Sequence, residues 1–537
     1  MTLALWCPIR ASRQGNPPSL TQKDTNPLCN PCMSLNYNFI WLLCYLLVLV
    51  GLAGYGFHRL SIVYLYWKNR NNKPQPKARF QELPVVTVQL PMFNEKFVVD
   101  RLLESVAALD YPQDKLEIQI LDDSTDDTTE QCYRKVEELK SRGFDAVCIH
   151  RTDRTGFKAG ALEAATKVAK GEFLLILDAD FVPEPDLLQK TIHFFTDENV
   201  GLVQTRWGHI NREYNLLTRI QGMYLDGHFA MEQTARNRSG RFFTFNGTAG
   251  IWRKCVIGDA GGWSHDTLTE DMDLSYRVQL KGWRFIYLND VVTPAELPVD
   301  MDGFKSQQHR WTKGSIQVCQ KILLDIWRSN APLKAKVEAT THLTCNYSYL
   351  LLALLCFLVY PICTQRIPEN ETVFMWFVNV ALFFMTSVAV CIFYMSAQIV
   401  VRPKSWWKEL PYLPLLLTLS VGMAVNNAKA VLEAIFGHQS AFVRTPKYGV
   451  DRKEDRRHVS QLKRNGYRAI KSVVIPVLEI ACGTFFLKLI IIMIRQGHYL
   501  SPILMIPFLG FYYTGFCSLG RMISNLLPAK QTAKAKN

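Results

Sequence analysis

Hydrophobic residues are distributed unevenly along the chain and divide it into two kinds of segment. Long apolar runs cover residues 38–57 and much of 343–526, whereas residues 83–330 alternate between apolar and polar positions as soluble proteins do. An apolar run of about 20 residues is long enough to cross the hydrocarbon core of a membrane as a helix. The pattern therefore predicts an integral membrane protein that carries one soluble domain.

Within the soluble segment, short apolar runs alternate with helical patterns. Strands are expected at 85–90, 116–121, 146–150 and 173–177, and helices at 97–109, 128–142 and 159–170. Alternating strands and helices favour a mostly parallel sheet covered by helices. Ligands of such α/β domains bind beyond the carboxyl ends of the strands, so candidate chemistry is sought there.

The same pattern divides the whole chain. We expect a loosely ordered tail at 1–37, a transmembrane helix at 38–57, the soluble domain at 83–312, interfacial helices at 313–342, membrane helices within 343–526 and a basic tail at 527–537. The later spans are expected at 343–363, 373–400, 471–494 and 501–526. Segment 409–436 combines an apolar half with a polar half and is ambiguous, which gives five full crossings, or six if it crosses too.

Composition and charge narrow the class of protein. With 48% hydrophobic residues, the chain is neither disordered nor a small disulfide scaffold. The net charge of +14 could indicate nucleic-acid binding, but no recognition module is present and the cations gather beside apolar runs. This distribution follows the rule that cytoplasmic loops of membrane proteins are basic. The cation distribution therefore favours a membrane protein over one with a nucleic-acid partner, and it predicts that the soluble domain lies in the cytoplasm.

Two acidic pairs follow predicted strands. Asp122 and Asp123 come directly after the strand at 116–121, and Asp178 and Asp180 follow the strand at 173–177. Two carboxylates with one residue between them, such as Asp178 and Asp180, can bind a divalent cation that also bridges a diphosphate. Taken alone, such a pair is also typical of a turn with side-chain-to-backbone hydrogen bonds.

Two further motifs complete the set. Thr269-Glu270-Asp271 precedes a helical stretch, and its acids either favour the helix N-terminus or provide a general base. The motif at 307–311, Gln-Gln-His-Arg-Trp, combines a guanidinium that can hold pyrophosphate with an indole that can stack on a sugar; alone it could also belong to an interfacial helix. His193, His209, His228 and His265 form no metal-spaced pair and are expected to be ordinary polar residues.

In this order and spacing, the four motifs resemble those of the family 2 processive β-glycosyltransferases, the cellulose synthase and hyaluronan synthase group, which have a GT-A fold. The resemblance is close over residues 83–320 and looser in the membrane region. The segments most similar to plant cellulose synthase-like mannan and xyloglucan-backbone synthases and their bacterial relatives are Leu90–Glu95, Phe245–Gly250, Gly261–Trp263 and Gln307–Trp311.

The resemblance implies a role for each matching residue. Asp271 would be the catalytic base, and Asp178 and Asp180 would hold Mg²⁺ or Mn²⁺. The nucleotide sugar would be bound by Asp122, Asp123, Lys158, Asp178 and Arg310. The acceptor would be bound by Phe245, Asn246, Gly247, Thr248, Glu270, Gln307 and Trp311, and a gating loop at about 440–469 would contribute Arg444, Thr445 and Lys447.

The activity that follows is polymerisation of a β-linked hexan, with β-1,4 the expected linkage, from UDP-glucose or GDP-mannose, with possible translocation of the product. The partners would be the nucleotide sugar, the growing polysaccharide and membrane lipid, in the plasma membrane of a bacterium or the Golgi membrane of a eukaryote. A non-processive enzyme that glycosylates a membrane lipid uses the same soluble domain and remains an alternative. A transporter with an accessory domain is disfavoured because intramembrane charges are sparse and the helical block shows no repeat.

Overall fold

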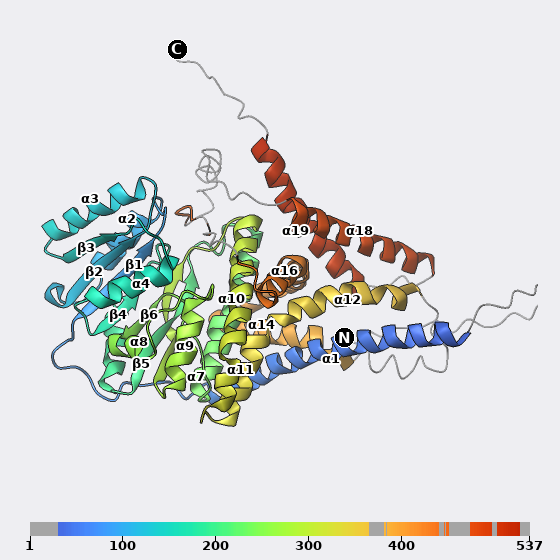
Figure 1. The fold of residues 1–537 in the computed structure, drawn as a ribbon, viewed down its shortest axis with the longest axis horizontal. Coiled ribbons are helices and arrows are strands. Elements are labelled where there is room, and N and C mark those ends of the chain that lie inside the picture. Colours follow the sequence, from blue (N-terminus) through green and yellow to red (C-terminus); the bar gives the residue numbers. More distant parts are fainter. Residues whose placement is uncertain are drawn as a thin grey trace, which may run out of the picture. The chain divides into compact units, whose positions relative to one another are not determined.

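The soluble part of the chain is built on one mixed sheet. The computed structural model describes residues 31–364, 381–382, 384–439, 445, 447–450, 473–496 and 502–526. Among these, seven strands form a sheet in the order β3-β2-β1-β4-β6-β5-β7 (Figure 1). The strands are β1 (Val86–Met92), β2 (Leu116–Asp122), β3 (Asp145–His150), β4 (Phe173–Ile176), β5 (Val200–His209), β6 (Gly250–Arg253) and β7 (Arg284–Ala295).

The first four strands confirm the expected α/β arrangement. β1 pairs in parallel with β2 and β4, and β2 pairs in parallel with β3. β6 is antiparallel to both β4 and β5, while β5 and β7 are parallel. Because β1, β2 and β4 are parallel neighbours, their carboxyl ends share one edge of the sheet, where Asp122 ends β2 and Asp178 follows β4.

Helices cover both faces of the sheet, which explains why the strands are continuously apolar. Phe173 and Leu175 of β4 belong to one buried core, and Leu174 and Ile176 belong to the other. The helices and helical turns of this part are α2 (Val99–Ala107), η1 (Gln113–Lys115), α3 (Thr128–Ser141), α4 (Phe157–Val168), α5 (Leu187–Thr191), η2 (Ile192–Thr196), α6 (Leu216–Asp226), η3 (Gly227–Gln233), α7 (Thr234–Arg238), α8 (Lys254–Asp259) and α9 (Glu270–Leu280).

The first apolar helix is longer than the expected 38–57. Helix α1 runs from Pro31 to Asn69, so it begins within the expected tail, and the part long and apolar enough to cross a membrane is Ile40–Asn69. Sequence reasoning ended the span at His58 and Arg59 because both are polar. In the structure His58 pairs with Glu338 and Arg59 pairs with Glu232, and the helix continues through both residues.

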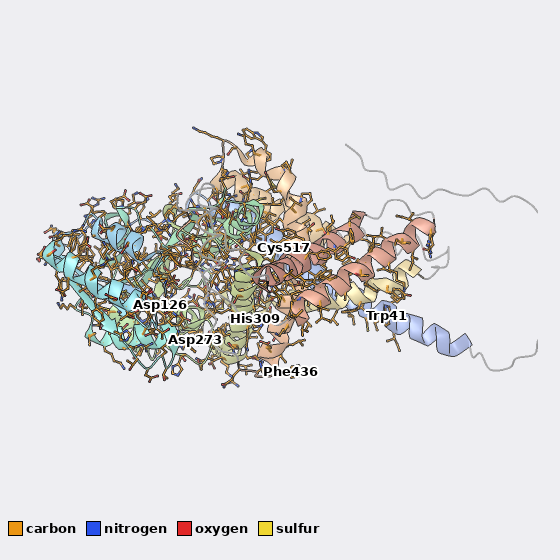
Figure 2. The ribbon with its side chains drawn as sticks, turned by 90° about the horizontal axis from the view of Figure 1, so that it is seen from above. Trp41, Asp126, Asp273, His309, Phe436 and Cys517 are labelled. Carbon is orange, nitrogen blue, oxygen red and sulfur yellow. The ribbon has the colours of Figure 1, made fainter. Side chains whose placement is uncertain are left out.

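The motif at 307–311 lies inside a long helix and not at the expected domain boundary of 312. Helix α10 (Met301–Arg328) has 28 residues and carries both this motif and the expected interfacial stretch. It packs against α9 and also against the apolar helices α16 and α19. Asp273 of α9 and His309 of α10 accordingly lie on neighbouring helices (Figure 2). One rigid element therefore connects the soluble domain to the apolar helices.

The remaining helices follow the apolar pattern. They are α11 (Leu333–Thr344), α12 (Tyr347–Thr364), η5 (Phe384–Val388), α14 (Ala389–Val401), η6 (Trp406–Tyr412), α15 (Leu413–Gly422), α16 (Ala424–Ile435), α18 (Val474–Arg495) and α19 (Pro502–Leu526). Among the described residues, Ile40–Asn69 and Val474–Arg495 can each cross a membrane, and two bent helix pairs raise the number of candidate spans to four if each pair is one span. The ambiguous segment 409–436 lies within one of these pairs, which bends by 41°. The first part of the expected span at 373–400 and most of the loop at 440–469 lie outside the described residues.

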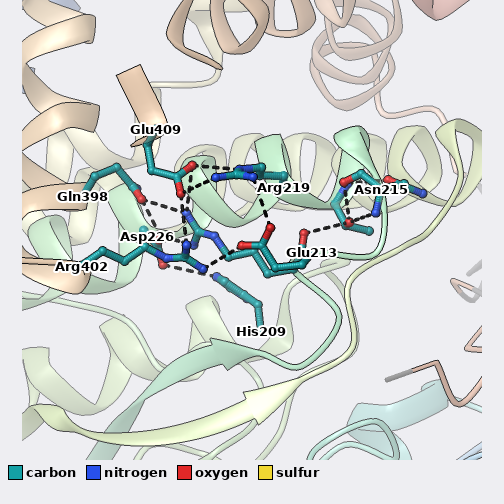
Figure 3. Close-up of polar contacts among 10 residues, drawn as sticks. His209, Glu213, Asn215, Arg219, Asp226, Gln398, Arg402 and Glu409 are labelled. Atoms are coloured by element: carbon teal, nitrogen blue, oxygen red, sulfur yellow. Dashed lines mark hydrogen bonds and ion pairs between the residues drawn. The ribbon is translucent and has the colours of Figure 1, made fainter. Parts of the chain in front are cut away.

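A buried network of charges joins the soluble domain to the segment that follows α14 (Figure 3). Glu409 has a fully buried side chain, and its carboxylate accepts hydrogen bonds from Arg219 at 3.1 and 3.2 Å and from Arg402 at 3.1 Å. Asp226 pairs with Arg212, whose guanidinium also donates to the side-chain oxygen of Gln398 at 2.8 Å. Each charge is matched, as a buried ion pair requires.

Replacing Glu409 with Gln should destabilise the protein, because it removes the fully buried carboxylate that pairs with Arg219 and Arg402 and leaves these partly exposed arginines only Glu213 among the described carboxylates. Breaking a fully buried pair costs roughly 3–5 kcal/mol. The partial exposure of both arginines makes the expected loss smaller than this but larger than for a surface pair, and it should lower the thermal unfolding temperature measured in detergent. The matched control is Lys190→Gln, which breaks a half-exposed pair with Asp186 worth about 0–1 kcal/mol. Equal unfolding temperatures for the two variants would contradict the proposed importance of the network.

Candidate active site

A pocket of about 190 Å³ opens at the carboxyl ends of β1, β2 and β4. The predicted site residues that line it are Asp123, Lys158, Asp178, Asp180, Asn246, Gly247, Glu270, Asp271, Gln307, Arg310, Trp311, Thr445 and Lys447. Asp122, Phe245 and Thr248 do not line it, and Arg444 lies outside the described residues. Residues as far apart in the sequence as Asp123 and Lys447 therefore converge on one cavity.

The carboxylate of Asp178 is held by a lysine from helix α4. The Lys158 ammonium pairs with Asp178 and donates to the backbone carbonyl of Gly247 at 2.9 Å. Burial alone would lower the pKa of Lys158, but the negative charges of Asp178, Glu270 and Asp271 outweigh burial and raise it. Lys158 therefore stays cationic where a diphosphate would need positive charge.

Asp180 is paired in the same manner from the other side of the pocket. Lys447 contacts the Asp180 carboxylate at 2.5 Å and donates to the carbonyl of Glu296 at 3.2 Å. The buried Glu296 carboxylate in turn accepts backbone N–H bonds from Tyr448 at 2.9 Å and Val450 at 3.1 Å. Glu296 thus holds residues 447–450 against the pocket.

Asp178 and Asp180 fit a divalent cation by their chemistry. Both are oxygen ligands, they are one residue apart, and they line the same cavity. Within the described parts of the chain, no three or more His, Cys, Asp or Glu side chains cluster as a metal-binding group. Mg²⁺ is commonly bound by one or two carboxylates together with substrate phosphates and water, which is what two aspartates could provide.

The two aspartates at the end of β2 have different surroundings, because Asp123 lines the pocket and Asp122 does not. Asp122 is fully buried and accepts hydrogen bonds from Thr129 at 2.7 Å and from the backbone N–H of Ser124 at 3.1 Å. Asp123 lines the pocket, and its carboxylate accepts hydrogen bonds from Nε of Arg151 at 2.8 Å and from Nη2 of the same guanidinium at 2.6 Å. Asp122 therefore shapes the turn, and Asp123 faces the ligand space.

Asp271 lies in the first turn of α9, where its Oδ1 accepts the backbone N–H of Met272 at 2.8 Å. Its other oxygen faces the loop at 246–248 so closely that a Cβ on Gly247 would lie 3.0 Å from it. Gly247 has a φ of +79°, so only glycine fits without strain. Burial, with repulsion from Glu270 as the second cause, raises the pKa of Asp271 to about 7, which suits a general base.

The loop beside Asp271 is fixed by a π-helical turn, η3. Gln233 donates to the Asn246 side-chain oxygen at 2.7 Å, so the amide of Asn246 donates to His228 Nε2 at 3.0 Å. The Nδ1 proton of His228 then points to Glu232, 3.1 Å away. Burial, with the positive charges of Arg236 and Arg59, lowers the pKa of His228 to about 3, which keeps the ring neutral as this pattern requires.

Phe245 and Thr248 do not line the pocket, but they contact the residues that hold its wall in place. Phe245 is buried against Trp252, with ring centroids 5.4 Å apart, and its backbone N–H donates to Ser275 at 2.9 Å. The Thr248 hydroxyl accepts the backbone N–H of Asp178 at 2.8 Å. The two residues therefore orient Asn246, Gly247 and Asp178, which do line the pocket.

Residues 84–314 match the model of the family described as glycosyltransferase like family 2. This segment is a family 2 glycosyltransferase domain. It contains the whole sheet and the four predicted motifs, so the resemblance inferred from those motifs is confirmed at the level of the domain.

Two curated plant relatives are similar to part of the chain. Glucomannan 4-beta-mannosyltransferase 2 of Arabidopsis thaliana is 42% identical over 286 residues, which cover 50% of this chain and 53% of the relative. Glucomannan 4-beta-mannosyltransferase 1 of Oryza sativa subsp. japonica is 41% identical over 277 residues, covering 51% and 53%, respectively. The matched part of the chain spans about half the length of these relatives.

A solved structure shares the fold of the family 2 domain. The mannosyltransferase PcManGT from Pyrobaculum calidifontis, in complex with GDP-Man and Mn²⁺, has a TM-score of 0.52 and 19% identity, and the match covers 74% of this chain and 100% of that one. At this identity the likeness concerns the fold alone, and it agrees with the expected GT-A architecture.

Several pocket residues of the glycosyltransferase domain were not among the predicted ones. Glu296, Trp207 and His209 line the pocket, and His228 fixes Asn246. Glu296 follows β7, and His209 and Trp207 end β5, two strands that the sequence did not resolve individually. The position after an apolar strand is the signal that could have found Glu296.

Replacing Asp180 with Asn should weaken Mn²⁺ binding at least roughly tenfold, since it removes one of two anionic oxygen ligands. The measurement is electron paramagnetic resonance of free Mn²⁺ titrated with the purified protein in the presence of GDP or, separately, UDP. Asp186→Asn is the control, because Asp186 is half-exposed and lines no part of the pocket. Unchanged affinity in Asp180→Asn would remove Asp180 from the metal site.

Proposed function

We propose that this chain is a membrane-embedded, inverting glycosyltransferase that polymerises a β-1,4-linked hexan from GDP-mannose. The observation that carries the proposal is the convergence of Asp271, Lys158, Asp178, Asp180 and Arg310 on one pocket of a family 2 domain. A basic carboxylate, two anionic metal ligands and two cations are the groups that transfer of a sugar from a nucleotide diphosphate requires.

In the proposed reaction, the oxygen of the acceptor hydroxyl attacks the anomeric carbon of the donor sugar, and Asp271 accepts the proton of that hydroxyl. The bond from that carbon to the diphosphate breaks on the opposite face, so an α-linked donor gives a β-linked product. No covalent intermediate with the protein is required. Asp271 can take the proton because burial and Glu270 raise its pKa towards neutrality.

The leaving diphosphate is stabilised by cations of the pocket. Lys158 and Arg310 line it near Asp178, and a divalent cation held by Asp178 and Asp180 would supply further positive charge. Each oriented donor of this type contributes about 3–4 kcal/mol to transition-state stabilisation in other enzymes. Asp123, held by Arg151, is proposed to bind the nucleoside, with Asp122 shaping its turn.

The acceptor is proposed to occupy a second cavity beside the pocket. This cavity of about 180 Å³ is also lined by Asn246, Asp271 and Trp311, and it extends to Phe393 and Tyr394 of α14. Aromatic rings such as that of Trp311 pack against the apolar faces of sugars. A cavity that reaches from the proposed base to the apolar helix α14 supports a processive enzyme. The multi-pass membrane region is proposed from the candidate spans, and the cytoplasmic active site from the basic residues beside the apolar runs.

The donor and metal are proposed from the relatives. Both curated relatives are named glucomannan 4-beta-mannosyltransferases, which favours mannose over glucose as the transferred sugar. The fold neighbour PcManGT was solved with GDP-Man and Mn²⁺, which agrees with a metal at Asp178 and Asp180.

The decisive experiment incubates the purified protein in proteoliposomes with labelled GDP-mannose or UDP-glucose, with and without Mn²⁺ or Mg²⁺. A high-molecular-weight product from GDP-mannose that a β-1,4-mannanase digests would support the proposal. A chloroform-soluble product with one or two sugars would replace it with the glycolipid alternative. Polymer made from UDP-glucose alone would contradict the proposed donor.

Replacing Asp271 with Asn should lower the turnover number roughly 10²- to 10⁴-fold, because the amide cannot accept the acceptor proton. Binding of GDP-mannose, measured by isothermal titration calorimetry, should persist. Asp266→Asn is the control, since Asp266 is an exposed carboxylate five residues earlier that lines no part of the pocket. Turnover of Asp271→Asn at the control's rate would exclude Asp271 as the base.

The pH dependence of kcat/KM should report the raised pKa of Asp271. The base acts only when deprotonated, so the rate should fall about tenfold per pH unit below about pH 7. Glu270→Gln removes one cause of the raised pKa and should move this acid limb to lower pH. The comparison is made on the position of the limb, not on the absolute rate. A limb that stays in place would argue that Glu270 does not act on Asp271.

A further inference from the structure

A second pocket, of about 410 Å³, lies away from the catalytic residues, where two apolar helices end. Trp67 and Arg70 come from the end of α1, and Val401 is the last residue of α14. The soluble domain contributes Arg206 of β5 and Arg238 of α7. None of the residues lining this pocket lines the catalytic one.

The pocket carries a strong excess of positive charge. Its lining contains four cations, Arg70, Lys73, Arg206 and Arg238, and a single carboxylate, Asp290. Asp290 already pairs with Lys73 at 2.8 Å, and both side chains are more than half exposed. Within the described part of the chain, none of the three guanidinium groups forms an ion pair with a carboxylate. The excess charge is therefore not neutralised by the protein itself.

Hydrogen-bond donors in the pocket are also incompletely used. The Nε of Arg238 is buried and has no hydrogen-bond partner among the described residues, while another of its nitrogens donates to the backbone carbonyl of Arg70 at 2.5 Å. Burial lowers the pKa of Arg238. An unpaired buried donor costs about 1–3 kcal/mol, so the protein itself does not fully satisfy this guanidinium group.

The sheet is distorted where it forms the pocket wall. Thr205 of β5 pairs with Leu288 of β7, but the next residue, Arg206, pairs with Val292, so residues 289–291 form an insertion in β7. The insertion brings Asn289 and Asp290 to the pocket, and Arg206 fastens it by donating to the Asn289 carbonyl at 2.8 Å. Such bulges re-aim side chains beside functional sites.

The strand register also separates the two pockets. Neighbouring residues of a strand point to opposite faces, and Arg206 lines the cationic pocket while Trp207 lines the catalytic one. A ligand in the cationic pocket would thus lie directly behind β5, the strand that forms one wall of the catalytic pocket.

The position of the pocket indicates the source of an anionic ligand. The candidate span of α1 ends at Asn69, and the apolar helix Met385–Val401 ends beside the same pocket. Trp67 is 36% exposed, and the guanidinium of Arg70 lies 5.2 Å from its ring centroid. Exposed aromatic residues at the end of an apolar helix mark the membrane interface, and basic pockets at that level bind anionic lipid headgroups.

We propose that this cationic pocket binds the phosphate group of an anionic membrane lipid. The lipid phosphate would accept hydrogen bonds from the guanidinium groups of Arg206 and Arg238, with Arg70 and Lys73 at the rim. A free phosphate shares the same chemistry, but the pocket's place at the end of two apolar helices favours the headgroup. This proposal does not depend on which sugar the enzyme transfers.

The test uses the full-length protein purified in a neutral detergent and measures binding of short-chain phosphatidylglycerol and of phosphatidylcholine. The unaltered protein should bind phosphatidylglycerol more tightly, and Arg206→Gln with Arg238→Gln should weaken that binding roughly thirtyfold. Arg134→Gln with Arg142→Gln is the matched control. It removes two exposed arginines at α3 that line neither pocket, and it should leave binding unchanged.

Two additions keep the test decisive. Lys73→Gln alters only an exposed side chain, so this variant should fold normally. It should weaken phosphatidylglycerol binding severalfold, and it replaces the double variant as the test if the double variant proves unstable. If inorganic phosphate displaces phosphatidylglycerol at equal concentration, the pocket binds phosphate, but its ligand is a soluble phosphate and not the lipid. Equal binding of the two lipids by the unaltered protein, or equal affinity in the double variant and its control, would overturn the proposal.

Discussion

The neutralisation of carboxylates gathered at one edge of the sheet is the constraint on which the site depends. Asp123, Asp178, Asp180, Glu270 and Asp271 line a single pocket, and like charges so close together repel one another. Arg151 holds Asp123, and Lys158 and Lys447 hold Asp178 and Asp180. Among the described residues, Asp271 forms no ion pair and instead has a raised pKa, which distinguishes this proposed base from the proposed metal ligands.

The same logic extends from the pocket into the apolar helices. Lys305 of α10 is buried, contacts Glu479 of α18 at 2.5 Å, and also donates to Thr514 and Ser518 of α19 at 3.0 Å. Arg59 of α1 meets Glu232 of η3, the turn that fixes Asn246. Buried charges thus connect helices that carry site residues to helices that are long and apolar enough to span a membrane. Because a buried charge must stay paired, a shift of one element would be costly unless the other followed.

Much of the fold could be predicted from local pattern. The strands β1 to β4 were expected within about two residues of their observed ends, because continuous apolar runs bounded by turns identify buried strands. The later strands β5 to β7 and the full length of α1 were not. β6 pairs antiparallel with strands distant in sequence. His58 and Arg59, through which α1 continues, have partners more than 150 residues away. Such long-range pairings leave no local signal.

The sequence by itself determined the class of chemistry, because carboxylates after strands, a Thr-Glu-Asp motif and the Arg-Trp pair at 310–311 are each short and local. The tertiary structure alone decided which of these residues face the pocket and which hold other residues in place. It buries Asp122 as support and exposes Asp123 to the pocket, gives Glu296 and His228 supporting roles, and brings Arg206 and Arg238 together behind the catalytic wall. The physical reason is that burial, pairing and pKa depend on neighbours that only folding brings together.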